Sequence, residues 1–187
     1  MKFYIKIVFL LMSIVWLPNC KPKMIDIEPS VFSIEKEFRP YFNTFLKEAA
    51  ERNVIIDTTN LIMRLNKSIS TDKCGTCNQF LNSPKQQKTI EIYTSEATCW
   101  GIATTNAKEA LIFHELGHCL LGRIEHTNET FTDGSPKSIM IANNADLYIP
   151  CVYVLDDMPE NCNKTGRRKY YIDELFNPAT PKPSWAK

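Results

Sequence analysis

The feature that most constrains this chain is the clustering of its histidines, since all three of them lie between residues 114 and 126. His114 and His118 belong to an H-E-x-x-H pattern. Positions i and i+4 of a helix project from the same face, so the two imidazoles can bind one metal ion. Glu115 is turned from His114 by about 100°, which places it better to hold a water beside the metal than to bind the metal itself. The pattern therefore predicts a metal-hydrolase site on a helix.

The residues around this pattern predict a buried helix over residues 107–121, a stretch without proline. Asn106 is a suitable N-cap, and Glu109 nearly completes a capping box. Gly122 supplies a left-handed end, with Arg123 at the negative end of the helix dipole. In the apolar part of the helix the polar side chains are those of His114, Glu115 and His118. When buried, these groups need a metal, water or hydrogen-bonding partners. The alternative is a buried helix whose histidines only form hydrogen bonds.

Residues 1–19 are predicted to be a lipoprotein signal peptide. They combine a basic start with an apolar run over residues 7–17, which is shorter than the ~20 residues of a membrane span. The run ends in Leu17-Pro18-Asn19-Cys20, which resembles a bacterial lipobox with its lipidated cysteine. Cys20 would then anchor an exported protein to a lipid bilayer of the cell envelope, with the outer membrane preferred and residues 20–30 as lipidated cysteine and tether. Cleavage nearby by ordinary signal peptidase is the alternative.

Loss of residues 1–19 would leave 168 residues and change the formal net charge from +1 to −1, because two lysines and no acidic residues are removed. Such a balanced charge does not indicate the basic surface that binds nucleic acid, so we expect no nucleic-acid partner. The length fits one domain with an adequate core. We expect this domain over residues 31–176, followed by an extended, proline-rich tail over residues 177–187.

The cysteines predict disulfide bonds. Apart from Cys20, the chain has an even number of cysteines, which in an exported protein indicates up to three bridges. They are Cys74, Cys77, Cys99, Cys119, Cys151 and Cys162. Cys151 and Cys162 flank an acidic loop and suggest a local bridge, and a bridge from Cys119 to the Cys74/Cys77 region would fix the metal helix. Cys74 and Cys77 could instead be half of a zinc ribbon or a redox pair.

The remaining pattern predicts a small number of further elements. Apolar residues at helical spacing predict a helix from Pro40 to about Arg52, and a short helix is expected over residues 170–176. β-Branched and alternating residues predict strands over residues 54–56, 61–65 and 89–94, the last at a sheet edge. Residues 68–88 are polar and are expected to form an extended loop.

Three stretches of the chain resemble metzincin-type zinc peptidases, and more closely small bacterial lipoproteins of that kind. The stretches are residues 114–123, Ser138-Ile139-Met140, and Tyr170-Tyr171-Ile172-Asp173-Glu174-Leu175-Phe176. The resemblance covers mainly the second half of the mature chain. It implies an α+β, zincin/metzincin-like single catalytic domain with a small mixed sheet and a central H-E-x-x-H helix. It also implies that Met140 lies under the metal as a hydrophobic floor, whereas an ordinary core methionine is the alternative.

The third metal ligand is expected to be His126, the remaining histidine. A catalytic zinc site uses three protein ligands plus water, and Gly122 allows the chain to turn back towards the metal. The spacing departs from the metzincin pattern, because Gly122 lies four and His126 eight residues after His118, instead of three and six. Carboxylates also bind zinc, so the alternative ligands are Glu125, Glu129 and Asp133.

These observations predict a membrane-anchored endopeptidase with one catalytic Zn²⁺ and a peptide or protein substrate. Glu115 would take a proton from a water at the metal and pass it to the leaving amine. Tyr148 and Tyr153 are candidates for an oxyanion or acid group only because they follow Met140. A surface lipoprotein that binds metal or a partner without turnover is the main alternative. A disulfide-stapled structural lipoprotein without metal is the third hypothesis.

Overall fold

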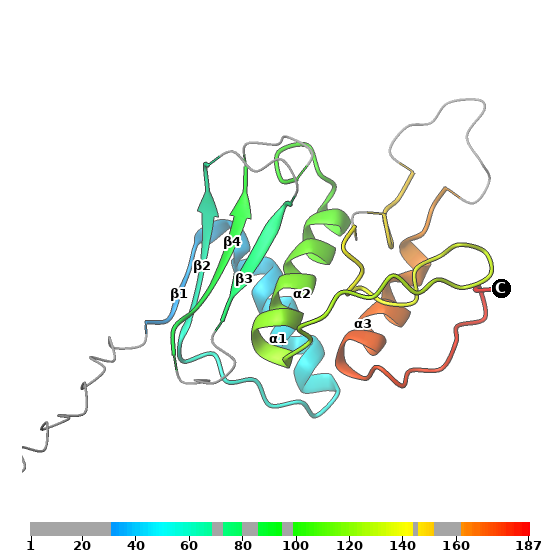
Figure 1. The fold of residues 1–187 in the computed structure, drawn as a ribbon, viewed down its shortest axis with the longest axis horizontal. Coiled ribbons are helices and arrows are strands. Elements are labelled where there is room, and N and C mark those ends of the chain that lie inside the picture. The colour runs from blue at the N-terminus through cyan, green and yellow to red at the C-terminus, as the bar shows by residue number, and fades with distance from the viewer. Residues whose placement is uncertain (1–30, 69–72, 80–85, 95–98, 144–145, 152–161) are drawn as a thin grey trace, which may run out of the picture.

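The architecture is α+β, with a four-stranded mixed sheet and three α-helices (Figure 1). The computed structural model describes residues 31–68, 73–79, 86–94, 99–143, 146–151 and 162–187. The elements are β1 (Ser33–Ile34), α1 (Arg39–Glu51), β2 (Leu61–Asn66), β3 (Gly75–Asn78), β4 (Lys88–Tyr93), α2 (Thr105–Leu121) and α3 (Arg168–Phe176), with short 3₁₀ turns before α1 and α3. The predicted signal peptide and Cys20 lie outside the described residues. Among the described helices, none has the length and apolar character to cross a membrane.

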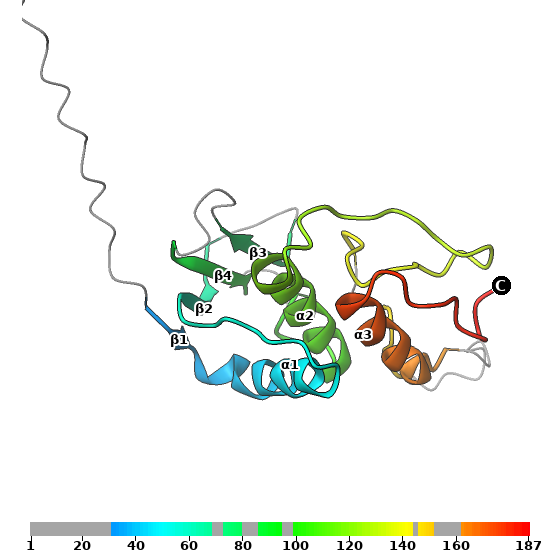
Figure 2. The same cartoon turned by 90° about the horizontal axis from the view of Figure 1, so that it is seen from below.

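The strand order is β1-β2-β4-β3, in which β1, β2 and β4 run parallel and β3 runs antiparallel to β4. Alternate residues of β2 and β4 are fully buried, among them Met63 and its partner Ile90. They share a hydrophobic core with Phe45 of α1 and with Ile112 and Leu116 of α2. Helices α1 and α2 cover one face of the sheet, and α3 packs on the side of α2 that is remote from the sheet (Figures 1 and 2). Helix α2 is therefore enclosed on several sides, as its apolar sequence predicts.

Two strand predictions are wrong for reasons of pairing. Residues 54–56 form no strand, and Ile55 is 98% exposed, because the run leaves α1 without a strand partner. The strand predicted over residues 89–94 is present as β4, but it lies inside the sheet and not at its edge. The edge is taken by β3, which forms within the polar stretch that was expected to be a loop.

The ends of the predicted helices differ slightly from expectation. Helix α2 begins at Thr105, because Oγ1 of Thr104, and not Asn106, accepts the capping hydrogen bond from the backbone N–H of Ala107 at 3.1 Å. Gly122 ends the helix with a φ of 67°, as predicted. Residues 177–187 contain no helix or strand, but Trp185 packs edge-on against Tyr170 and Phe131. The tail thus covers the outer side of α3.

Candidate metal centre

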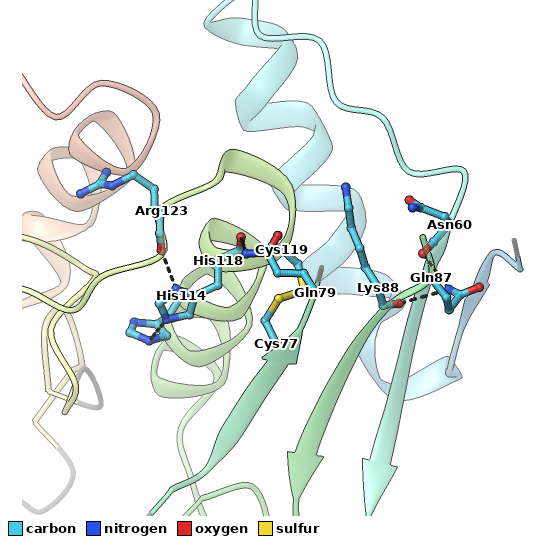
Figure 3. The surroundings of a disulfide bond; sticks show 9 residues. All are labelled: Asn60, Cys77, Gln79, Gln87, Lys88, His114, His118, Cys119 and Arg123. Carbon is cyan, nitrogen blue, oxygen red and sulfur yellow. Dashed lines mark hydrogen bonds between the residues drawn. A yellow bond between two sulfur atoms is a disulfide. The ribbon is translucent and has the colours of Figure 1, made fainter. Parts of the chain in front are cut away.

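The three histidines meet at one point. Nε2 of His114 lies 3.0 Å from Nε2 of His118 and 3.0 Å from Nε2 of His126, and the latter two atoms are 3.2 Å apart. His114 and His118 project from the same face of α2, as the i, i+4 spacing requires (Figure 3). His126 comes from the segment after the helix. It is exposed, whereas His114 is buried and His118 half-buried, so the group opens to solvent on one side.

The backbone fixes the tautomers of the two helical histidines. Nδ1 of His114 donates to the carbonyl of Ile139 at 2.9 Å, and Nδ1 of His118 donates to the carbonyl of Arg123 (Figure 3). Since a carbonyl only accepts, both Nδ1 atoms carry the proton and both Nε2 atoms present a lone pair. Burial lowers the pKa of His114 to about 4 and also lowers that of His118, so both rings are neutral near pH 7. Two neutral Nε2 lone pairs that face each other repel, and a cation between them removes that repulsion.

The geometry fits one metal ion. Three nitrogens at these separations can all lie ~2.1 Å from a common point, the length of a zinc–nitrogen bond. Neutral imidazoles with the second nitrogen bound to a carbonyl are the form in which histidine binds metals. In the part of the chain that the structure describes, no carboxylate or thiolate joins the group. Glu129, one of the alternative ligands, pairs instead with Lys137 at 3.0 Å. The group of His114, His118 and His126 could therefore bind a metal ion.

Two backbone contacts accommodate the long spacing between His118 and His126. Gly122 adopts the left-handed conformation, and the N–H of Arg123 then donates to the carbonyl of Gly117 at 3.0 Å. The segment is held again by Thr127, whose N–H donates to the carbonyl of Met140 at 3.0 Å. The chain thus turns back beside the helix and returns His126 to its open end.

Met140 lies against the metal helix. It is fully buried, and a Cβ atom on Gly117 would come within 2.8 Å of its sulfur atom. Gly117 is the residue before His118, so its missing side chain makes the room that Met140 occupies. The Ser138-Ile139-Met140 turn therefore packs directly beneath the helix, and its middle residue is the one that holds His114.

Glu115 lines a cleft beside the histidines. The cleft is formed by residues of β3, of α2 and of the segment after α2. Its wall includes Lys73, Gly75, Glu115, His118, Ile124 and His126. The Glu115 side chain is buried against β3, where a Cβ on Gly75 would lie only 2.5 Å from its Oε1 atom. Burial raises the pKa of Glu115 to about 8, and the positive charge of Lys73 opposes this shift. A buried carboxyl group with a raised pKa thus lines the same cleft as His118 and His126.

The disulfides fix the strand that forms the cleft. Cys77 of β3 is bonded to Cys119, the residue after His118 (Figure 3). Cys74 is bonded to Cys99. The predicted bridge from Cys119 to the Cys74/Cys77 region is thus confirmed. Cys74 and Cys77 belong to separate bridges, so the zinc-ribbon and redox-pair hypotheses are wrong.

The predicted local bridge between Cys151 and Cys162 is also present. Close to the metal helix, the amide of Gln79 donates to the carbonyl of His118 at 2.7 Å, a contact that the sequence did not predict.

Tyr148 does not reach the cleft. Its side chain is buried against Tyr171, away from the cleft residues, so its candidacy as an oxyanion or acid group fails. Tyr153 lies outside the described residues. Sequence patterns did not single out Gly75 and Gly117, whose importance comes from contacts with residues distant in the chain. Comparison with models of protein families, with curated proteins and with solved structures finds no significant match.

Proposed function

We propose that this protein is a zinc-dependent peptide hydrolase whose metal is bound by His114, His118 and His126. This proposal depends on the convergence of three Nε2 atoms, two of which belong to histidines, His118 and His126, that line the same cleft as Glu115. Structural zinc sites are usually closed by four protein ligands, whereas catalytic sites have three and keep one position open. A set of three histidines that is open to a cleft matches the catalytic type.

Glu115 is the proposed general base. A zinc ion, when bound, supplies a Lewis acid that polarises the scissile carbonyl and lowers the pKa of a water ligand to about 7. Glu115 takes the proton of the attacking water and returns it to the nitrogen of the leaving amine. Burial raises the pKa of Glu115 to about 8, and the positive charge of a bound metal ion would oppose that shift and favour the ionised form, which is the form that accepts the proton.

The shape of the cleft favours an extended peptide as substrate. Consecutive residues of β3 and its end, residues 75–79, line the cleft. Among the described strands β3 is the last in the sheet, so its outer edge pairs with none of them. Such an edge binds an extended peptide through backbone hydrogen bonds. A substrate on β3 would pass Glu115, His118 and His126 in the same cleft.

Two features support a relation to metzincin-type peptidases. A third histidine after the metal helix completes the ligand group, and the turn that contains Met140 packs beneath that helix.

Three disulfides are typical of proteins in oxidising compartments, which agrees with export. We further propose that Cys20 anchors the mature protein to a membrane of the bacterial envelope.

The test is Glu115→Gln, with Glu125→Gln as matched control, because Glu125 is an exposed acidic residue next to His126. Hydrolysis of a labelled, unfolded protein and bound zinc are measured on the same samples. We expect Glu115→Gln to lower kcat/KM by about 10²- to 10⁴-fold with its zinc retained, and Glu125→Gln to stay near wild type. Equal activity of Glu115→Gln and wild type would refute the proposal. Zinc binding without hydrolysis by wild type would favour the non-catalytic surface lipoprotein.

A further inference from the structure

A buried carboxylate behind the metal site is not explained by the proposed chemistry. Glu174 lies on α3, far along the chain from the histidines, and its side chain is only 6% exposed. It accepts hydrogen bonds from Arg123 Nη2 at 2.7 Å, from Ser138 Oγ at 2.7 Å and from the N–H of Ile139 at 3.2 Å. A buried carboxylate with several charged or backbone donors is a rigid anchor for the groups around it.

Two of these donors belong to the residues that hold the histidines. The carbonyl of Arg123 accepts from Nδ1 of His118, and the carbonyl of Ile139 accepts from Nδ1 of His114. Glu174 binds the side chain of Arg123 and the backbone N–H of Ile139. One carboxylate therefore fixes both peptide segments that orient the metal-binding imidazoles.

Further contacts stiffen the same assembly. The Arg123 guanidinium also donates to the backbone carbonyls of Glu174 and Leu175, at 3.0 and 3.1 Å, and so caps the last turn of α3. In Figure 3 this guanidinium points away from the histidines towards α3, while the carbonyl of the same residue faces His118. Ser138 Oγ accepts from the N–H of Met140 at 2.9 Å, and the carbonyl of Met140 holds Thr127, next to His126.

From this geometry we infer that Glu174 is a positioning residue for the metal centre, acting through Arg123 and the Ser138-Ile139-Met140 turn. Groups that bind the ligands of a metal set the orientation and tautomer of those ligands, and their loss lowers metal affinity by about 10- to 100-fold. Glu174 acts on these groups and not on the ligands themselves, so the lower end of that range is expected for its loss. The inference rests on the metal site of the proposed function and not on turnover. It predicts that α3, which contributes no ligand, controls how tightly the metal is bound.

Glu174→Gln is the appropriate variant because it preserves shape and removes one acceptor. The two carboxylate oxygens face obligate donors, Arg123 on one side and the N–H of Ile139 on the other. A glutamine amide must therefore direct its NH₂ group at one of them in either orientation. Glu48→Gln is the matched control, because Glu48 is half-buried and also accepts from two arginines, Arg52 and Arg168, and neither of these arginines holds a histidine.

The experiment measures zinc affinity by chelator competition, and the visible spectrum of the Co²⁺-substituted protein, below the unfolding temperature of every variant. We expect Glu174→Gln to bind zinc about 10-fold more weakly with an altered Co²⁺ spectrum. Glu48→Gln should match wild type in both measurements even though it is less stable. Ser138→Ala should show a smaller change in the same direction, and it decides the test should Glu174→Gln fail to fold.

Two results would overturn the inference. One is an unchanged Co²⁺ spectrum with zinc affinity within about twofold of wild type in Glu174→Gln, or in Ser138→Ala where the first variant does not fold. The other is an equal loss of affinity in Glu48→Gln, which would assign the effect to general destabilisation. Absence of zinc binding by wild type would instead refute the proposed function, so the two failures are distinguishable.

Discussion

Replacing Gly75 by alanine should displace the proposed general base without touching a metal ligand. A Cβ at this position would lie 2.5 Å from Oε1 and 2.9 Å from Cδ of Glu115. Since ordinary contacts begin at 3.4 Å, one of the two groups must move by about 1 Å. The strand is not free to move, because Cys74 and Cys77 on either side of the glycine are bonded to Cys99 and Cys119. The Glu115 carboxyl group must therefore move.

A misplacement of about 1 Å in a reacting group costs on the order of 10²-fold in rate, so kcat/KM of Gly75→Ala should fall about 100-fold. Zinc content should not change, because the three Nε2 atoms are untouched. Gly166→Ala is the control, since a Cβ there meets nothing within 4 Å. Hydrolysis of a labelled peptide and elemental analysis provide the two readouts. Activity of Gly75→Ala within about threefold of wild type would refute the placement of Glu115, and so would loss of its zinc.

Three further predictions concern the disulfides, the helix contacts and the anchor. Replacing Cys77 and Cys119 together by alanine removes a bridge with a sequence separation of 42. The free energy of unfolding, measured by urea titration, should fall by about 4 kcal/mol. A loss below about 1 kcal/mol would contradict this. Burial alone would raise the pKa of Glu48, but hydrogen bonds from Arg168 and Arg52 outweigh it and lower that pKa. The stability that Glu48 contributes is therefore present above its ordinary pKa and lost as the pH falls through the lowered pKa. The urea midpoint should fall more steeply from about pH 5 to about pH 3 in wild type than in Glu48→Gln. Parallel curves for the two proteins would contradict this. Cys20→Ala should move the protein from the membrane fraction to the soluble fraction, because it removes acyl chains that contribute ~0.8 kcal/mol per buried methylene, and a variant that stays in the membrane fraction has another anchor.

Local sequence patterns predicted the parts of the fold that depend on local spacing. The H-E-x-x-H spacing placed His114 and His118 on one face of a buried helix, and Gly122 marked the end of that helix correctly. The convergence of His126 with them followed from ligand number, although the loop between them is longer than the family pattern. Helical spacing also predicted α1 to within one residue at each end.

The failures arise where distant contacts decide the structure. The residues of β3 are polar and have no strand pattern of their own, and the strand forms because it pairs with β4 and is cross-linked to α2 through Cys77. Residues 54–56 have a strand pattern but no partner. Gly75 and Glu174 are important because they contact Glu115 and Arg123, which lie 40 and 51 residues away along the chain. A single sequence contains no record of such contacts.

Zinc stoichiometry decides whether the three histidines bind a metal ion. The protein, purified with its disulfides intact, is stripped of metal, titrated with Zn²⁺ against a coloured chelator, and compared with His126→Ala. We expect one tightly bound Zn²⁺ per chain in wild type and much weaker binding in the variant, because three converging Nε2 atoms become two. Folded wild-type protein that binds no zinc, or a variant that binds it as tightly as wild type, would contradict the account.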